Sequence, residues 1–542
     1  MHVFKTIKVM FIMYVLFVPA HLYAQDPFED LVREQDQKFQ QLKKEADEEL
    51  ERLKAVDKEF AEILNRAWKE LDLNTGKKPY TEPKPENVPI ARPSDIPEKK
   101  PDPKIEPKPE KEKLPEPEKR PDATPKKSEA PEQVVPEKPE QIARPEKPPV
   151  TEPEKTTRPE SIPTADVPKI IDFGGREGEP LSLSFFGTPI RIRYDKRLNV
   201  RLHGTVSEST ISTFWETIGK YDYENFLMQM LQVRKELELN DWGYCLLLTG
   251  AAEQLYLQPG NDQVLFIWFM LVKSGFDAHT GFDDNRIVLL LPSKHTVYNT
   301  PFYELGGKTY YITFLGTVNS EVHSLYTYEG NHKEAVQLID YTVYRSPGLQ
   351  KQIEPRNFTF SFHGTEFSVP VQYNINVVDY FDSYPQINLD VYFKASLAPE
   401  TETSLLDGLK PIIDGKSEGE AVNILLRFVQ TAFNYRTDDE QFGVEKPLFP
   451  EETVFYPYSD CEDRSFLFAY LTTHLLGLEV IGLHYPGHLA TAVKFTSNVE
   501  GDSVLYNNTR YIICDPTFIN ADYGECMPQF KSVDPEVIQT KN

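Results

Sequence analysis

Three residues towards the C-terminal end of the chain have the types that nucleophilic catalysis needs: Cys461, His488 and Asp515. A thiol attacks a carbonyl carbon when an imidazole takes up its proton, and a carboxylate on the other ring nitrogen fixes the imidazole's orientation. Taken singly, each has a simpler interpretation, as a buried cysteine, a turn histidine or a strand-end aspartate. We predict a catalytic triad because the elements around the three residues bring them to one seam.

The element that carries the cysteine is predicted to be a buried helix. Ser459 and Glu462 have the spacing of a capping box, so a helix is expected over 460–476, with Gly477 as its C-cap. The segment is apolar nearly all round, which is typical of a helix at the centre of a domain. Cys461 falls in the first turn, where unsatisfied N–H groups favour the thiolate over the thiol.

Two strands are predicted to carry the other two residues. His488 opens an alternating strand after a Pro-Gly turn, and Asp515 ends the strand in "RYIICDPTF". His484 is a competing histidine, but it lies before the turn. A zinc pair formed by His484 and His488 needs a continuous helix, which Pro486 and Gly487 break, so neither a metal nor a cofactor is expected.

The motifs Cys-x-Asp-x-Ser at a helix start, Pro-Gly-His and Asp-Pro-Thr resemble the bacterial transglutaminase-like superfamily over residues 420–525. The resemblance implies an α+β, papain-like core with Cys461 as nucleophile, His488 as base and Asp515 as orienting acid. Arg464 stands where the motif frequently has lysine. Members of the superfamily include cross-linkers, cysteine peptidases, deamidating enzymes and inactive relatives, so the resemblance leaves the reaction open.

The globular part of the chain has the pattern of a duplication. "SFFGT" at 184–188 recurs as "SFHGT" at 361–365, and the apolar helix at 245–256 matches 424–435. Two later matches follow in the same order, at 266–268 with 466–468 and at 310–312 with 511–513. We predict a first copy over 171–357 and a catalytic copy over 358–542, each with a small β element.

The first copy is predicted to be degenerate. The offsets of 200 and 201 residues place Asn261, Ile287 and Phe314 at the positions of the triad. None of these residue types can replace the thiol, the imidazole or the carboxylate. We therefore expect the first copy to serve in packing or in substrate binding.

An insertion is predicted directly before Cys461, because the offset between the copies rises from 179 to 200 there, a gain of about 21 residues. The segment 436–460 is rich in Pro, Phe and Tyr, and we expect it to form one wall of the substrate cleft. The alternative is a loop that plugs the core. Tyr456 and Tyr458 in this segment are the candidates for an oxyanion donor.

The N-terminal third has three parts of different composition. Residues 1–24 have the basic start, short apolar core and small residue before the cut that are typical of a signal peptide, with an uncleaved anchor as the alternative. Residues 25–76 carry an amphipathic helix with a heptad-like, coiled-coil pattern, for which self-association or a membrane-proximal spacer is expected. Residues 77–170 are rich in Pro, Glu and Lys, which predicts a disordered linker that acts as a tether. A secreted or periplasmic protein follows.

Charge and cysteine content limit the partners. The net charge of −25 argues against nucleic acid, which needs clustered Lys and Arg. Four cysteines are too few for a disulfide scaffold; Cys514 and Cys526 are the nearest pair, with two buried thiols as the alternative. The leading hypothesis is a thiol enzyme that acts on an amide of a peptide or protein through a thioester. The second is a non-catalytic envelope adaptor built from both copies.

Overall fold

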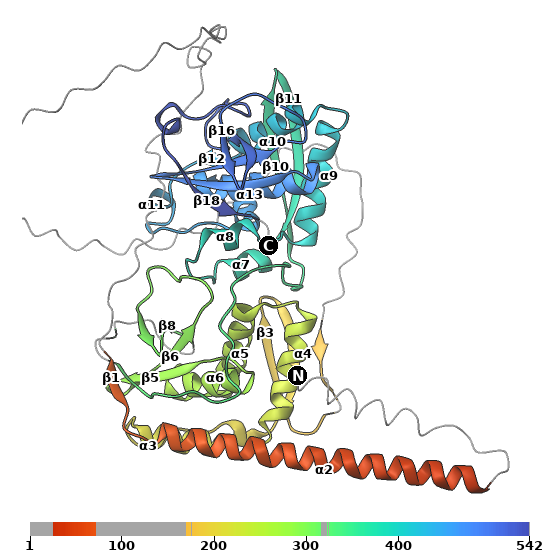
Figure 1. The fold of residues 1–542 in the computed structure, drawn as a ribbon, viewed down its shortest axis with the longest axis vertical. Coiled ribbons are helices and arrows are strands. Elements are labelled where there is room, and N and C mark those ends of the chain that lie inside the picture. Colours follow the sequence, from red (N-terminus) through yellow and green to blue (C-terminus); the bar gives the residue numbers. More distant parts are fainter. Residues whose placement is uncertain (1–24, 72–169, 175, 316–321, 323–324, 541–542) are drawn as a thin grey trace, which may run out of the picture.

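The computed structural model describes residues 25–71, 170–174, 176–315, 322 and 325–540. The predicted signal segment 1–24 and nearly all of the predicted linker 77–170 lie outside these residues. The described chain is an α+β protein in two halves, with the first half below the second in the view of Figure 1. Among the residues described, no helix has both the length and the apolar character that a membrane span needs.

The first half consists of an N-terminal helix, four further helices and two sheets. The helices are α2 (Gln25–Leu64), α3 (Glu208–Ile218), α4 (Tyr223–Glu236), α5 (Asp241–Leu255) and α6 (Asn261–Lys273). The larger sheet has the order β1 (Lys69–Leu71), β9 (Leu325–Thr327), β5 (His279–Asp283), β6 (Arg286–Pro292), β8 (Lys308–Thr313), β7 (Phe302–Leu305). The smaller has the order β2 (Ile171–Asp172), β4 (Thr188–Tyr194), β3 (Glu179–Phe185).

The second half opens with a long hairpin, β10 (Ile353–Phe362) and β11 (Thr365–Asn374), which begins before the predicted boundary at 358. The helices that follow are α7 (Ile375–Phe381), α8 (Leu389–Phe393), α9 (Pro399–Ile413), α10 (Glu418–Ala432), α11 (Asp438–Gln441), α12 (Pro450–Phe455) and α13 (Cys461–Leu476). A short parallel pair joins β12 (Asn434–Tyr435) to β13 (Tyr458–Ser459). The main sheet has the order β16 (Ser503–Tyr506), β17 (Thr509–Cys514), β15 (His488–Lys494), β14 (Glu479–Tyr485), β18 (Glu536–Gln539).

Apart from β1 at the edge of the first sheet, the strands of the two main sheets have the same order. The order β7-β8-β6-β5-β9 of the first half matches β16-β17-β15-β14-β18 of the second, and each sheet follows an apolar helix, α6 or α13. The hairpins β3–β4 and β10–β11 turn on Phe186-Gly187 and His363-Gly364, all at positive φ. That backbone is the type I′ turn, whose twist matches the flanking strands. The correspondence therefore extends from the arrangement of the elements to the type of turn.

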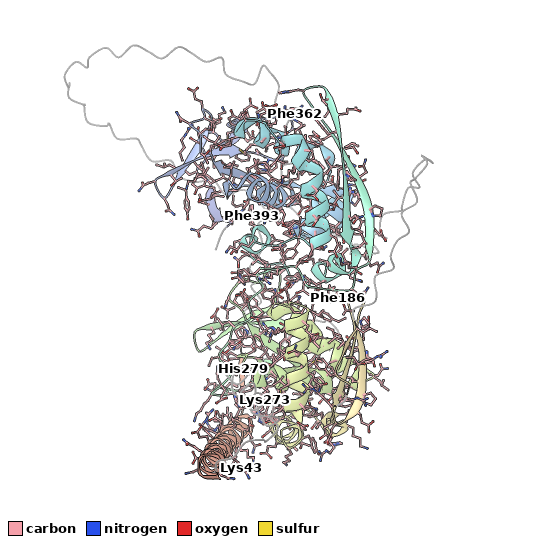
Figure 2. All side chains as sticks on the ribbon, turned by 90° about the vertical axis from the view of Figure 1, so that its right-hand side faces the viewer. Lys43, Phe186, Lys273, His279, Phe362 and Phe393 are labelled. Atoms are coloured by element: carbon pink, nitrogen blue, oxygen red, sulfur yellow. The ribbon has the colours of Figure 1, made fainter. Side chains whose placement is uncertain are left out.

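Helix α2 belongs to the first half, whose core contains its C-terminal end. Phe60 is buried and packs edge-on against Trp215, with 4.7 Å between ring centroids. Asp57 of α2 accepts a hydrogen bond from Lys273 and one from His332 at 3.1 Å. In Figure 2, Lys273 lies above the helix that carries Lys43. The apolar and charged side chains of α2 therefore dock this helix on the first half. The sequence pattern of the helix alone does not show which residues these side chains contact.

The described residues on either side of the predicted linker belong to the same half. Before the linker, β1 pairs antiparallel with β9; after it, β2 pairs parallel with β4. The tether prediction itself falls on residues that lie outside the described ranges.

The halves are packed against each other through polar and aromatic side chains. Asn240 at the start of α5 donates to the Tyr384 hydroxyl at 2.8 Å and accepts from Tyr380 at 3.0 Å. Phe186 packs edge-on against Tyr380, with 5.5 Å between centroids, and lies at the junction in Figure 2. A Cβ on Gly243 would lie 2.6 Å from the Tyr380 hydroxyl, so the close approach needs glycine there.

Candidate active site

The fold brings the three predicted catalytic residues to one place in the second half. Cys461 is the first residue of α13, His488 is the first of β15, and Asp515 directly follows β17. Strands β15 and β17 are neighbours in the sheet, and α13 packs on β14 and β15. The predicted C-cap is confirmed, since Gly477 has the left-handed φ of 68°.

The imidazole and the carboxylate form a buried pair. His488 Nε2 lies 2.8 Å from Asp515 Oδ2. The other carboxylate oxygen, Oδ1, accepts hydrogen bonds from the backbone N–H groups of Thr517 at 2.9 Å and Phe518 at 3.2 Å. Because Asp515 is held in this way, it directs Nε2 and leaves Nδ1 as the nitrogen that can accept a proton. In the part of the chain described, His488 Nδ1 has no hydrogen-bond partner.

An aromatic residue covers the imidazole. Phe530 stacks on His488 with 5.2 Å between centroids and 6° between planes, and on Tyr485 at 4.7 Å. Lys531, the next residue, is 3.0 Å from Asp502 and holds the segment down. Phe530 was missed by the sequence analysis, because it lies in a short polar segment after the last triad residue and has no periodic pattern around it.

The thiol has a different partner from the one that a triad requires. Cys461 Sγ donates to Glu462 Oε2 at 2.9 Å. Burial, and then the charges of Glu462 and Asp460, raise the pKa of the Cys461 thiol well above its ordinary value, while the backbone N–H of Leu489 acts in the opposite direction. The expectation of a thiolate favoured by the helix start is therefore wrong for this conformation, because desolvation and nearby carboxylates outweigh the helix terminus.

Carboxylates gather around the start of α13. Asp460, Glu462 and Asp463 are all buried, and burial raises the pKa of each, that of Asp460 to about 6. The neighbouring Asp438 is raised in the same way. Arg464 is the buried countercharge; it donates to Ser459 Oγ at 3.1 Å and to a backbone carbonyl at 2.8 Å.

The predicted capping box is displaced by one residue. Asp463 Oδ2 accepts from the backbone N–H of Asp460 at 3.3 Å, so these two residues fill the capping positions in place of Ser459 and Glu462. The other oxygen of Asp463 accepts from the N–H of Leu448 at 2.8 Å, which ties the insertion to the helix. Glu462 is thereby free of a capping role and can reach the thiol.

The later part of the insertion is buried next to the start of α13, and the site is closed to solvent. Leu448 and Phe449 are buried, and the Cys461 and His488 side chains are both 0% exposed. The alternative interpretation of 436–460, a loop that plugs the core, describes this conformation. The two candidate oxyanion donors have cationic neighbours: Lys446 lies 4.9 Å from the Tyr456 ring and Arg436 lies 3.8 Å from the Tyr458 ring.

The first half has other residues at the equivalent positions. Asn261 begins α6 as Cys461 begins α13, and Phe314 follows β8 as Asp515 follows β17. The hairpin register assigns Arg286 to the place of His488, since Asp283 pairs with Arg286 as Tyr485 pairs with His488. The predicted equivalent, Ile287, is thus off by one residue. None of the residues at these positions is a nucleophile or a general base of the predicted kind.

The remaining cysteines and His484 lie outside the triad. Cys514 and Cys526 are both buried thiols and form no disulfide with each other in this structure, which is the alternative that the sequence left open. His484 Nδ1 lies 3.6 Å from Glu536 on the neighbouring strand. In the described ranges, no group of three or more His, Cys, Asp or Glu side chains has an arrangement that could hold a metal ion.

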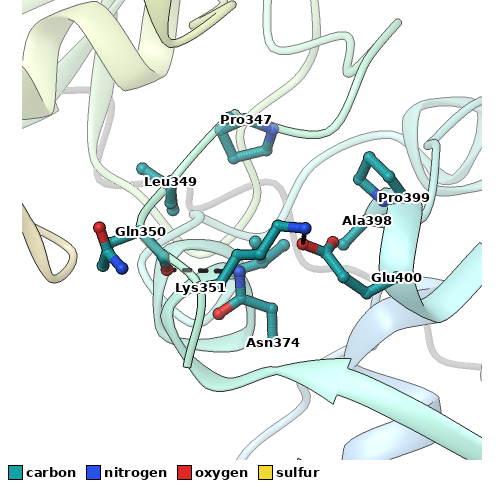
Figure 3. Close-up of a pocket in the computed structure, with 10 residues that line it drawn as sticks. Pro347, Leu349, Gln350, Lys351, Asn374, Ala398, Pro399 and Glu400 are labelled. Atoms are coloured by element: carbon teal, nitrogen blue, oxygen red, sulfur yellow. Dashed lines mark hydrogen bonds and ion pairs between the residues drawn. The ribbon is translucent and has the colours of Figure 1, made fainter. Parts of the chain in front are cut away.

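Three hollows of the described surface have linings that include no triad residue. One, of about 310 Å³, lies at the junction of the halves, where Figure 3 shows Pro347 and Leu349 beside the ion pair Lys351–Glu400. The other two, of about 390 and 420 Å³, lie in the first half, the latter beside Asn261. Because Cys461 and His488 are fully buried, access of any ligand to Cys461 requires a movement of the residues that cover it.

Comparison of the chain with protein-family models, with curated proteins and with solved structures gives no match. The resemblance to the transglutaminase-like superfamily stays a prediction from the motifs.

Proposed function

We propose that this chain is a secreted or periplasmic, transglutaminase-like thiol enzyme that acts on an amide bond of a peptide or protein. The observation that carries the proposal is the buried His488–Asp515 pair, at 2.8 Å, beside a helix that begins with Cys461. A buried imidazole with a fixed carboxylate on Nε2 and an available Nδ1 is suited to take a thiol proton.

The reaction follows from these groups. The Cys461 sulfur bonds to the carbonyl carbon while its proton passes to His488 Nδ1, and His488 then gives that proton to the departing amine as the C–N bond breaks. Water attacks the resulting thioester, His488 takes the proton of the water, and the C–S bond breaks to restore the thiol and release a carboxylic acid. An amine in place of water gives a cross-link. We favour hydrolysis because water is always present.

The described conformation is then a latent state of the enzyme, in which the thiol does not react. Both reacting side chains are without solvent exposure, and the thiol is bonded to Glu462. Opening of the cover formed by the insertion and by Phe530 is the step that admits substrate.

We also propose that the two halves are copies of one papain-like unit. The identical strand order, the matching helices α6 and α13, and the two hairpins with the same turn support this proposal. Asn261, Arg286 and Phe314 then mark a copy without catalytic function.

A non-catalytic envelope adaptor is the second candidate function. The observation that favours it is the complete burial of Cys461 and His488, since a site that never opens has no use for a nucleophile. The ligand would in that case be bound on the surfaces of the two halves.

The test is acyl transfer by the full chain. Unfolded casein is incubated with the protein and hydroxylamine, which converts a thioester to a hydroxamate that mass spectrometry locates. Product that disappears in Cys461→Ala and in His488→Ala supports the enzyme. Absence of product with the unaltered chain, or equal product with Cys461→Ala, supports the adaptor.

A further inference from the structure

The Cys461 thiol has one hydrogen, which a triad would direct to His488. In the structure it donates to Glu462 Oε2 at 2.9 Å, while Nδ1 of His488 accepts no hydrogen bond from any residue described. Asp515 occupies the other ring nitrogen, so Nδ1 is the only nitrogen of this ring left for the thiol. The site thus contains the parts of a triad with the thiol bonded elsewhere.

We propose that Glu462 is a fourth functional residue of this site, a lock that holds the thiol hydrogen away from His488 until the site opens. The inference rests on the proposed function, because a lock has meaning only for a thiol that reacts. In the locked state the S–H bond is directed at the carboxylate. In the released state the same proton passes to Nδ1, which leaves a thiolate and an imidazolium.

The position of Glu462 explains why it can act in this way. It is the second residue of α13 and is fully buried. The capping position that its spacing predicts is filled by Asp463, which accepts from the Asp460 N–H at 3.3 Å. Glu462 has no capping role, lies next to the nucleophile and is excluded from water, so its Oε2 is available to accept the thiol hydrogen without competition from solvent.

The hydrogen bond between Glu462 and the thiol depends on the elements packed around Glu462. The acidic groups that act on Glu462 are Asp438 of α11, Glu445 of the insertion and Asp460 at the start of α13. Asp438 and Glu445 belong to the insertion that the first half lacks. Movement of the insertion would hydrate Glu462, weaken its bond to sulfur and release the proton to His488.

The same residues suggest matched variants. Glu462→Met keeps the length of the side chain and removes the acceptor, and a buried Met side chain carries no desolvation cost of a polar group. Glu462→Gln is the second variant if the first fails to fold. It should change the thiolate fraction of Cys461 in the same direction by a smaller amount. Asp438→Asn is the control, because it removes a charge from the same cluster while its acceptor for the Lys446 N–H is kept.

The experiment measures the Cys461 thiolate at pH 7 from its absorbance at about 240 nm, as the difference between each variant and the same variant with Cys461→Ser. This reading requires no reagent to enter the buried site. We expect the thiolate fraction to rise about tenfold or more in Glu462→Met, one pKa unit of the thiol. The rise should vanish when His488→Ala is added.

Three results overturn the inference: no rise in either Glu462 variant, an equal rise in Asp438→Asn, or a rise that persists without His488. The proposed function is judged separately by acyl transfer. A His488-dependent thiolate without acyl transfer would show that Glu462 holds the thiol proton and would reject an amide as the substrate of this thiol. Acyl transfer with an unchanged thiolate would support the enzyme and reject the lock.

Discussion

Glu451 offers a stability test of the insertion. Its buried carboxylate accepts hydrogen bonds from the Ala398 N–H at 2.9 Å, the Asn374 N–H at 3.4 Å and the Thr401 hydroxyl at 2.6 Å. It therefore joins the insertion to the end of β11 and the start of α9. Burial raises the pKa of Glu451 from the ordinary 4.5 to about 7, in spite of these bonds.

The sign of the pH dependence follows from this direction. A carboxyl group with a raised pKa in the folded state binds more protons folded than unfolded between pH 4.5 and 7, so stability falls as pH rises through that window. At about 1.4 kcal/mol per pKa unit, the shift of Glu451 corresponds to roughly 3 kcal/mol in the free energy of unfolding. The folded protein is destabilised by this amount above pH 7 and is not destabilised by it below pH 4.5.

The perturbation is Glu451→Gln, which cannot ionise. Its amide nitrogen faces the Ala398 N–H, a mismatch of donors that costs about 1–3 kcal/mol at every pH. We therefore expect the stability of the variant, relative to the unaltered chain, to improve by about 3 kcal/mol between pH 4.5 and pH 7.5. Glu420→Gln, at a surface pair with Lys416, is the control and should show no such change.

The assay is hydrogen exchange of peptides that span residues 395–405, read by mass spectrometry. All four tryptophans lie in the first half, so fluorescence would not follow this region. A variant whose stability differs from that of the unaltered chain by a constant amount at all pH values would refute the reasoning about Glu451.

Three further outcomes are expected. Phe60→Ala should destabilise the first half by about 3–5 kcal/mol, read as an earlier tryptophan fluorescence transition, because it removes a buried ring; an unshifted transition would mean that helix α2 is not docked. Asp515→Asn keeps the acceptor for the backbone N–H groups but lacks the charge beside the imidazole, so acyl transfer should fall on the order of 10²–10⁴-fold with little change in Tm. Ser465→Ala breaks the 3.1 Å bond to the Leu489 carbonyl and should cost about 1–3 kcal/mol by thermal unfolding. Thr472→Val, which removes a buried hydroxyl that has no hydrogen-bond partner among the described residues, should cost nothing; equal losses would count against the Ser465 bond.

The local pattern of the sequence was sufficient for the elements that carry the site. The helix over 460–476, the strand opened by His488 and the strand closed by Asp515 lie where caps, turns and alternation predicted them. These signals are local, since a cap or a Pro-Gly turn acts within a few residues. The motif positions of Cys461, His488 and Asp515 were accessible for the same reason.

The protonation partners were decided only by tertiary structure. A helix start favours a thiolate in isolation, but the insertion and the carboxylates packed around Cys461 reverse the direction of the thiol pKa. The one-residue displacement of the capping box, which frees Glu462, depends on the Leu448 N–H that the insertion supplies to Asp463. The desolvation of a group depends on all the residues packed around it, many of them distant in the sequence. A local sequence pattern therefore does not predict it.

The long-range connections were likewise beyond the sequence by itself. Composition predicted a linker after the N-terminal helix, and the pairing of β1 with β9 and of β2 with β4 shows that the described residues on either side of it belong to one half. Phe530 covers His488 although 42 residues separate them in the chain. Such contacts join segments whose own patterns are complete without them. The sequence by itself therefore determined the elements and the residues of the candidate site, whereas packing decided which groups meet and whether water reaches them.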